Sequence, residues 1–126
     1  MGNLKEGACP FCNTSDFLVK DEYSYVRWDV YPVSEGHALI VPFRHVSSYF
    51  DLTNDERKSM FGLLDEAKRL IEEKYNPDGF NIGINDGEAA GQTIMHVHMH
   101  LIPRYEGDMK DPRGGVRGVI PEKQKY

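Results

Sequence analysis

The sequence predicts an α+β domain in which one long helix packs on an antiparallel sheet of about five strands. Residues 53–75 repeat apolar side chains at helical spacing. Several shorter segments alternate or run apolar between turns rich in Gly, Pro and Asn. A chain of 126 residues can form one hydrophobic core. We therefore expect a single domain over residues 1–126, with its core at 9–104 and an irregular tail at 105–126.

The first expected strands form a hairpin within residues 17–29. This stretch is rich in Tyr, Val and Trp, which favour strands, and the polar residues 20–22 interrupt it. After a turn, residues 37–41 form a compact apolar strand that Pro42 ends. We expect this strand to lie at the centre of the sheet.

The long helix is expected to begin after Leu52. Thr53 and Glu56 have the spacing of a capping box, in which both side chains accept hydrogen bonds from backbone N–H groups at the helix start. Residues 76–79, Asn-Pro-Asp-Gly, end it. One apolar stripe should pack on the sheet, formed by Met60, Phe61, Leu63, Leu64, Ala67, Leu70, Ile71 and Tyr75.

Two further strands are expected after the helix. Residues 80–84 alternate apolar with polar or small side chains, as in a half-buried strand. Residues 94–102 form the last strand, which Pro103 ends. One face of that strand is apolar and can enter the core, whereas the other carries three histidines, His96, His98 and His100.

Charge and hydropathy exclude several classes of partner. With 15 Lys and Arg against 20 Asp and Glu, the net charge of -5 opposes broad attraction to nucleic acid or to an anionic membrane. No apolar run approaches the roughly 20 residues that a bilayer span needs, and the first residues lack the pattern of a secretory signal. We expect a cytoplasmic protein that binds neither nucleic acid nor a membrane.

All five histidines lie in two short segments, with His37 and His45 in the first and the other three on the last expected strand. Side chains two residues apart on a strand are separated by about 6.6 Å, so the three can perform different tasks. Metal binding by two of them, or a polar surface without a function, is the alternative. Three alternating histidines among only five favour a functional site.

Residues 91–102, GQTIMHVHMHLI, resemble the signature of the histidine triad (HIT) nucleotide hydrolases and transferases. Residues 36–42, GHALIVP, and 85–90, NDGEAA, extend the resemblance, the second toward the fragile-histidine-triad branch that hydrolyses dinucleoside polyphosphates. The resemblance covers residues 9–104. It implies a HIT-like fold, a homodimer whose two sheets join around paired helices, and a substrate in which a nucleoside monophosphate carries a second group on its phosphate.

By this resemblance, His98 is the nucleophile. Neutral imidazole can attack the α-phosphorus and form a covalent nucleotidyl-histidine intermediate, provided that an acceptor holds its other nitrogen as N–H. His100 would donate a hydrogen bond to the phosphate oxygens and to the leaving group. The resemblance places His37 behind these rings, where it orients them. A buried histidine that merely opens a core strand is the alternative for His37.

The resemblance also implies substrate contacts. Gln92 and Thr93 lie in a Gly-containing turn whose side chains and N–H groups can hold phosphate oxygens, and Asn85 is expected to face the same pocket. Asp29 lies eight residues before His37, at the position where this family hydrogen-bonds the ribose hydroxyls. The alternative for Asp29 is a surface carboxylate at the end of a strand.

Cys9 and Cys12 form a C-x-x-C pair, which occurs in redox proteins and in zinc sites. A thioredoxin-like site needs a strand before the pair and a helix after it, but only eight residues precede Cys9 and polar residues follow Cys12, so zinc is the better interpretation. His45 and His96 would complete a Cys2His2 site, as in some zinc-containing HIT proteins. Such a zinc ion would be structural. Two free thiols in a metal-free relative are the alternative.

The predicted activity is hydrolysis at the α-phosphate of a dinucleoside polyphosphate or a nucleoside phosphoramidate, with release of AMP. In the related galactose-1-phosphate uridylyltransferases a glutamine occupies the position of His100, so His100 favours hydrolysis over transfer. The alternatives are a nucleotidyltransferase or phosphorylase that uses an acceptor other than water, and a nucleotide-binding regulatory module with vestigial catalysis. In the tail, Arg113 and Arg117 could close over distal phosphates.

Overall fold

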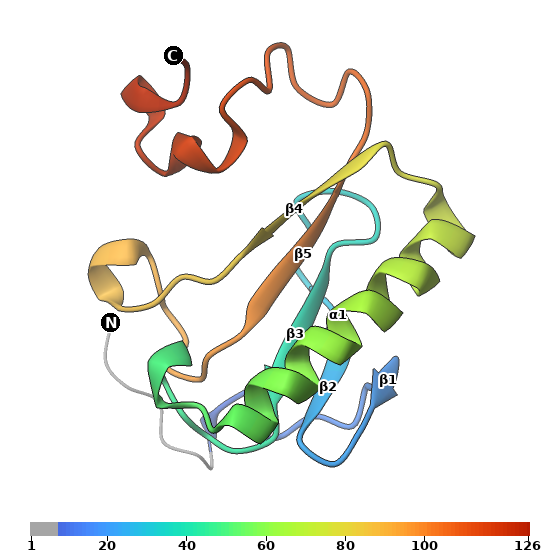
Figure 1. The fold of residues 1–126 in the computed structure, drawn as a ribbon, viewed down its shortest axis with the longest axis vertical. Coiled ribbons are helices and arrows are strands. Elements are labelled where there is room, and N and C mark those ends of the chain that lie inside the picture. Colours follow the sequence, from blue (N-terminus) through green and yellow to red (C-terminus); the bar gives the residue numbers. More distant parts are fainter. Residues whose placement is uncertain (1–7) are drawn as a thin grey trace.

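The computed structural model describes residues 8–126 and contains the predicted five-stranded antiparallel sheet and long helix (Figure 1). The strand order is β1-β2-β3-β5-β4, which leaves β1 and β4 at the edges and confirms the expected central place of β3. The elements are β1 Val19–Lys20, β2 Ser24–Trp28, β3 Ala38–Pro42, α1 Asn54–Tyr75, β4 Gly79–Gly83 and β5 Met99–Arg104.

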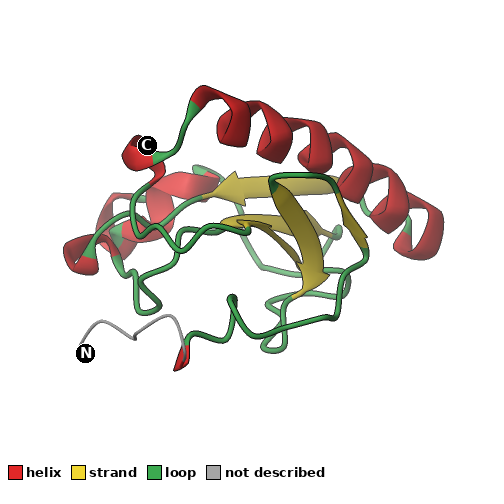
Figure 2. Ribbon diagram, turned by 90° about the horizontal axis from the view of Figure 1, so that it is seen from below, coloured by secondary structure: helices red, strands yellow, loops and turns green. Residues whose placement is uncertain are grey.

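The sheet is covered on both faces. Helix α1 lies on one face, and loops that include the N-terminal part of the described chain lie beneath the other (Figure 2). A large cluster of buried side chains joins α1 to the sheet, with Ile40, Met60 and Ile71 among its members. A smaller cluster on the opposite face contains Cys9 and Phe11. Every residue of β3 is buried because its alternating side chains enter both clusters.

Helix α1 begins and ends as its sequence predicts. The Thr53 hydroxyl accepts a hydrogen bond from the Glu56 N–H (3.1 Å), and the Glu56 carboxylate accepts one from the Thr53 N–H (2.9 Å). Arg44 binds the same carboxylate at 2.8 and 2.9 Å and lowers the pKa of Glu56. Asn76, in the left-handed conformation, terminates the helix.

The buried stripe of α1 is narrower than predicted. Met60, Leu63, Ala67 and Ile71 are buried, but Phe61 is 50% exposed. The buried positions follow one line at spacings of three and four residues, and Phe61 lies about 100° around the helix from Met60. Phe61 therefore projects away from the sheet, as an apolar side chain without a partner in this core.

The last strand begins and ends later than predicted. Residues 94–98 are irregular, and β5 runs from Met99 through Pro103 to Arg104. Pro103 is tolerated because pairing with β3 ends at Leu101. Its carbonyl accepts a hydrogen bond from the Ser34 hydroxyl (2.6 Å), so the missing N–H lies on a side of β5 where no strand needs it.

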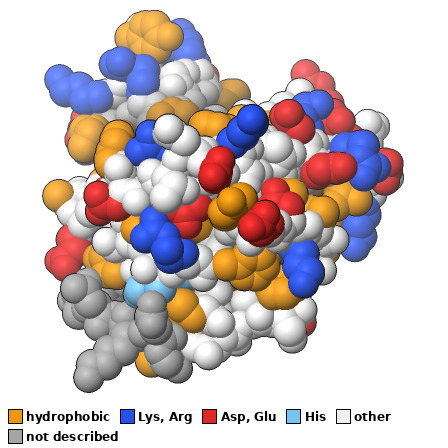
Figure 3. All heavy atoms as spheres, turned by 60° about the horizontal axis from the view of Figure 1, so that its bottom comes forward, with side chains coloured by type: hydrophobic (Ala, Val, Ile, Leu, Met, Phe, Trp, Pro, Cys, Tyr) orange, Lys and Arg blue, Asp and Glu red, His pale blue; other side chains and the backbone are white. Residues whose placement is uncertain are grey.

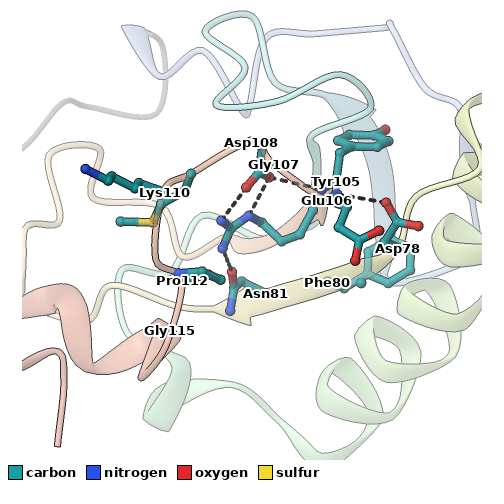
Figure 4. A pocket seen from close by; sticks show the side chains of 13 residues that line it. Asp78, Phe80, Asn81, Tyr105, Glu106, Gly107, Asp108, Lys110, Pro112 and Gly115 are labelled. Carbon is teal, nitrogen blue, oxygen red and sulfur yellow. Dashed lines mark hydrogen bonds and ion pairs between the residues drawn. The ribbon is translucent and has the colours of Figure 1, made fainter.

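The tail is irregular but tied to the sheet. The Arg104 guanidinium donates hydrogen bonds to Asp108 (2.8 and 2.9 Å) and to the side-chain oxygen of Asn81 on β4 (2.7 Å), and the Glu106 N–H donates to Asp78 (2.8 Å) (Figure 4). Two short 3-10 turns follow, Gly115–Val119 and Pro121–Lys123.

The tail also packs on itself. Gly114 has φ +91, and a side chain there would collide with the Gln124 carbonyl. The Gln124 side chain in turn donates a hydrogen bond to the Arg113 carbonyl (3.3 Å). Within the described part of the chain, no helix combines the length and the apolar character that crossing a bilayer requires.

The capping box gives a prediction about stability. Thr53→Ala removes the hydroxyl that accepts from the Glu56 N–H, and we expect it to lower the free energy of unfolding by about 1 kcal/mol in urea titrations. Thr53→Ser keeps the hydroxyl and serves as the control, with a loss of less than about 0.5 kcal/mol. Equal losses in the two variants would show that the hydroxyl is not the source of the effect.

Candidate active site and metal centre

His98 lies just before β5 with one ring nitrogen committed. Its Nδ1 is 2.9 Å from the backbone carbonyl oxygen of His96. A carbonyl oxygen only accepts hydrogen bonds, so Nδ1 carries the hydrogen and Nε2 keeps a free lone pair. The ring of Phe11 packs against the His98 ring, with centroids 4.8 Å apart, and restrains its rotation. The result is an imidazole with one nucleophilic nitrogen in a fixed direction.

A second backbone group determines which ring nitrogen carries the hydrogen in His37 and, through His37, in His100. The Val33 N–H donates to His37 Nδ1 (3.0 Å), so His37 carries its hydrogen on Nε2. That nitrogen lies 2.9 Å from His100 Nδ1 and 3.3 Å from a carboxylate oxygen of Asp29. His100 Nδ1 is therefore an acceptor. Its remaining hydrogen is on Nε2, which is available as a donor.

All three histidines are held neutral. Burial lowers the pKa of His98 and of His37, although Asp29 opposes the shift in both. Burial, together with the neighbouring His98 and His37, lowers the pKa of His100 to about 4. On the face drawn in Figure 3, histidine forms only a small part of the surface. Near pH 7 the site thus offers a neutral imidazole with a free lone pair, His98, and a neutral N–H donor, His100.

Asp29 lies between the histidines and an apolar cavity. One of its oxygens faces His37, and the other accepts a hydrogen bond from the Tyr31 N–H (2.9 Å). The cavity has a volume of about 360 Å³, and His98 and Asp29 line it. The other residues that line it are mostly apolar: Pro10, Phe11, Arg27, Val30, Tyr31, Leu39 and Ile94. Such a space suits a flat, largely apolar ring system beside a polar edge.

The three residues predicted to hold phosphate differ in their exposure and surroundings. Asn85 is exposed and lines a second cavity together with His37 and His100. Thr93 is exposed on the loop before His98. Gln92, in contrast, is 4% exposed and its amide is used within the protein.

Gln92 shapes the loop around the site. Its side-chain oxygen accepts from the Gly87 N–H (2.8 Å), and its amide nitrogen donates to the carbonyls of Ser47 (2.8 Å) and Ile94 (3.1 Å). The Asp86 carboxylate reinforces the same loop by accepting hydrogen bonds from the Ser48 hydroxyl (3.0 Å) and from the backbone N–H of Tyr49 (2.8 Å). We did not predict the Asp86 contacts, because they join segments 37 and 38 residues apart.

The four predicted metal ligands meet in one place. Cys9 Sγ lies 3.4 Å from His96 Nδ1, and Cys12 Sγ lies 3.2 Å from His45 Nδ1 and 3.5 Å from His96 Nδ1. All four ligand atoms are within 4.8 Å of one another. The other nitrogen of His96 is 2.7 Å from the Pro42 carbonyl, which holds it as N–H and turns Nδ1 toward the sulfurs.

These distances fit a tetrahedral ion. Bonds of about 2.3 Å to sulfur and 2.0–2.1 Å to nitrogen place neighbouring sulfur and nitrogen ligands roughly 3.5 Å apart. The observed sulfur–nitrogen separations of 3.2–3.5 Å are close to that value. No disulfide joins the two cysteines. The group is therefore able to hold a metal ion, and its donor set is the one that zinc prefers.

Two contributors to the site were not predicted. Phe11 lies between the two cysteines, and its backbone carbonyl accepts from the Tyr25 hydroxyl (2.6 Å), which fixes it against His98. The Val33 N–H sets the proton of His37. A residue pattern carries no signal for either, since the first is a contact over 87 residues of sequence and the second has as its donor a backbone N–H, which every residue except proline possesses.

Comparison with known proteins agrees with this architecture. Residues 11–107 match the HIT domain family. A bis(5'-adenosyl)-triphosphatase of Saccharomyces cerevisiae is 39% identical over 97 residues, which are 76% of this chain and 47% of the yeast protein, so the chain spans just under half of that relative.

Two solved structures share the fold. A HIT family protein from Bacillus anthracis superposes with a TM-score of 0.74 at 35% identity, over 79% of this chain and 75% of that one. A Zn-bound histidine triad family protein from Mycobacterium smegmatis does so with a TM-score of 0.75 at 31% identity, over 85% and 82%. Since the family match includes the sheet, the helix and all three histidines that meet beside Asp29, this chain belongs to the HIT domain family.

Proposed function

We propose that this protein hydrolyses a nucleotide at its α-phosphate through a covalent intermediate on His98 and releases a nucleoside monophosphate. One observation carries the proposal: the backbone carbonyl of His96 leaves a single free nitrogen on a neutral His98, at the wall of a cavity. The yeast relative, named a bis(5'-adenosyl)-triphosphatase, supports hydrolysis of a phosphoanhydride or a related bond.

The nucleoside occupies the cavity of about 360 Å³ beside His98. A purine can pack between the apolar side chains of Phe11, Leu39 and Ile94, which line that cavity. The carboxylate of Asp29, 14% exposed, lies where the sugar hydroxyls can donate hydrogen bonds to it. This arrangement sets the α-phosphorus next to the free Nε2 of His98.

Two displacements at phosphorus complete the reaction. In the first, the lone pair of His98 Nε2 forms a nitrogen–phosphorus bond while the bond from phosphorus to the leaving group breaks, and the leaving group departs with that electron pair. In the second, a water oxygen attacks phosphorus and the bond to His98 breaks. An amine leaving group takes a proton from solvent as it departs in the first step. In the second step the attacking water gives its oxygen to the monophosphate and a proton back to solvent, so His98 is restored in its neutral form.

His100 stabilises the charge that develops in both steps. Its Nε2–H donates to the leaving group or to a phosphate oxygen, since its Nδ1 is occupied by His37. We assign Asn85 and Thr93 to the phosphate oxygens because both are exposed, Asn85 in the cavity that His37 and His100 line and Thr93 on the loop that leads to His98. Gln92 acts indirectly by holding the loop that carries Thr93. His37 and Asp29 fix the direction in which His100 donates.

We propose a structural zinc ion held by Cys9, Cys12, His45 and His96, a set that the Zn-bound mycobacterial relative supports. Zinc in such a closed site supplies no catalytic group and contributes folding free energy. It would fix the His96 backbone, whose carbonyl orients His98, and the segment that carries Phe11.

We also propose a homodimer. β4 is an edge strand, so one row of its backbone groups pairs with no strand of residues 8–126. Phe61 on α1 and Ile82 on β4 are each 50% exposed, so both elements leave a large apolar side chain partly uncovered. A second copy can extend the sheet through β4 and cover both side chains.

The nucleophile is tested by His98→Ala. We expect turnover of adenosine 5′-phosphoramidate to fall by about 1,000-fold or more, because the covalent route is lost. Affinity for AMP should change by less than about tenfold, since the cavity and Asp29 remain. Chromatography of the products and calorimetric titration with AMP measure the two effects.

A trapping experiment complements the variant. Wild-type protein quenched in alkaline denaturant during turnover should carry an adenylyl group on His98, detected by mass spectrometry of peptides. Asn85→Ala is the control, because it should weaken binding but still form the adduct. Ordinary turnover by His98→Ala, or an adduct on another residue, would rule out the assignment.

The neutral state of the triad predicts how stability depends on pH. An unfolded histidine titrates near pH 6.5, but His100 in the folded chain titrates at about 4, so between these values the unfolded state binds more protons. Stability should therefore fall as the pH is lowered from 6.5 toward 4. His100→Gln removes one such group, and thermal melts should show a smaller fall than in wild type. An equal or steeper fall would mean that His100 is not held neutral.

Two variants test the proposed zinc site, because one should lose zinc and the other should lose only activity. Cys9→Ser should lose zinc and lower the melting temperature by about 5 °C or more, because metal binding is coupled to folding. His98→Ala leaves all four ligands intact and should keep a full complement of zinc. Elemental analysis and thermal melts measure both. Wild-type protein purified without chelators that contains no zinc would contradict the proposal.

A further inference from the structure

One cation lines the cavity beside His98. Arg27 is the only Lys or Arg of residues 8–126 on its wall, and Asp29 is the only carboxylate. Apart from His98, the remaining side chains on the wall are apolar or aromatic. A charged group that a ligand covers in such surroundings loses its water, which is costly unless the ligand brings hydrogen-bond acceptors of its own.

Strand β2 directs Arg27 and Asp29 to the same side of the sheet. Arg27 pairs with Leu39 of β3, which belongs to the buried cluster on the face opposite α1. The Asp29 N–H donates to the His37 carbonyl (2.9 Å), so the ladder continues past Trp28 and the Asp29 side chain returns to the face of Arg27. Side chains two residues apart on a strand are separated by about 6.6 Å, a distance comparable with that from the sugar hydroxyls of a nucleoside to its base. With the sugar at Asp29, the base therefore reaches Arg27.

The Arg27 guanidinium makes few contacts within the protein. Its Nε donates a long hydrogen bond to the Trp28 carbonyl (3.4 Å), and no other hydrogen bond or ion pair joins it to residues 8–126. The Asp29 carboxylate already accepts from a backbone N–H and faces His37. Asp16 lines an adjoining cavity that Arg27 also borders, but it is exposed and does not pair with Arg27. The two terminal nitrogens of Arg27 can therefore donate to a ligand.

The charge of Arg27 acts at the end of the cavity where Phe11 lies. The Tyr25 hydroxyl donates to the Phe11 carbonyl (2.6 Å), and Phe11 lines the cavity. Burial raises the pKa of Tyr25, and the positive charge of Arg27 opposes this rise. A base packed against Phe11 would thus present one edge to the Arg27 side chain.

An arginine in this position can distinguish purines by the group at C6. Guanine and hypoxanthine carry an oxygen there, which lies beside N7, so a guanidinium can donate one hydrogen bond to each of these two acceptors. Adenine carries an amino group there, which is itself a donor and offers the guanidinium only N7. Adenine would leave one donor of the buried guanidinium without a partner.

We infer that Arg27 contacts the base and that this protein prefers nucleotides of guanine or hypoxanthine to those of adenine. The inference rests on the proposed function, which places the nucleoside in this cavity, and it narrows the substrate class. It departs from the release of AMP that we expected from the sequence. Asp29 and His98 would then serve any nucleotide, whereas Arg27 would determine which base is accepted.

Calorimetric titrations with GMP and with AMP test the preference without a chemical step. In wild-type protein the Kd for AMP should exceed the Kd for GMP by about tenfold, as expected for one two-point contact between arginine and the base. Arg27→Met keeps an unbranched apolar side chain but removes the donors, and should bring the ratio close to 1. The ratio of kcat/KM for guanosine and adenosine 5′-phosphoramidates should change in parallel.

Two further variants serve as controls. Arg27→Lys keeps the positive charge but not the planar pair of donors, so it should lose most of the preference. Lys20→Met removes a cation from the neighbouring strand β1, at a residue that lines neither cavity, and should keep the wild-type ratio. Thermal melts check that all variants are folded. A wild-type ratio near 1, an unchanged ratio in Arg27→Met, or an equal fall in Lys20→Met would overturn the inference.

The binding measurements separate this inference from the proposed function. If neither phosphoramidate is hydrolysed but GMP binds more tightly than AMP only while Arg27 is present, hydrolysis at His98 is wrong and the role of Arg27 is supported. If both phosphoramidates are hydrolysed with equal kcat/KM and the two nucleotides bind equally, only the role of Arg27 is wrong.

Discussion

The hydrogen bond from the His98 ring to the His96 carbonyl is the contact on which the site depends. It decides which nitrogen of His98 is free and where that nitrogen points. The carbonyl is itself held in place, because the His96 ring is fixed by the Pro42 carbonyl on one side and by the two thiols on the other. The cluster of Cys9, Cys12, His45 and His96 is therefore joined to the candidate nucleophile through the residue His96.

Hydrogen bonds also determine which nitrogen carries the hydrogen in the other two histidines, His37 and His100. The Val33 N–H donates to Nδ1 of His37, so the hydrogen of His37 is on Nε2. That N–H faces Nδ1 of His100, so the hydrogen of His100 is on its own Nε2, and the Asp29 carboxylate lies beside Nε2 of His37. Burial keeps these rings neutral, so their roles follow from which nitrogen carries hydrogen rather than from charge. Two backbone groups thus determine the protonation pattern of three side chains.

The sequence predicted features that depend on local pattern. The capping box of α1 and the central strand were found in the structure, because spacing and periodicity determine them. The grouping of Cys9 with His96, 87 residues apart, was predicted instead from the number of ligands that a zinc ion needs and from the resemblance to the family. The start of β5 and the internal use of Gln92 were not predicted, since each depends on contacts between distant segments. The roles of the other site residues were predicted from the resemblance to the HIT family.

The late start of β5 has a consequence for transplanting this site. Because His96 lies before the strand, its carbonyl is outside the ladder that joins β5 to β3 and can accept from a side chain. On a regular central strand, the same carbonyl would be engaged by a neighbouring strand. Grafting alternating histidines onto an ideal sheet would copy their spacing but lose the acceptor that orients the reactive ring. A designed enzyme of this kind needs the irregular backbone as much as it needs the histidines.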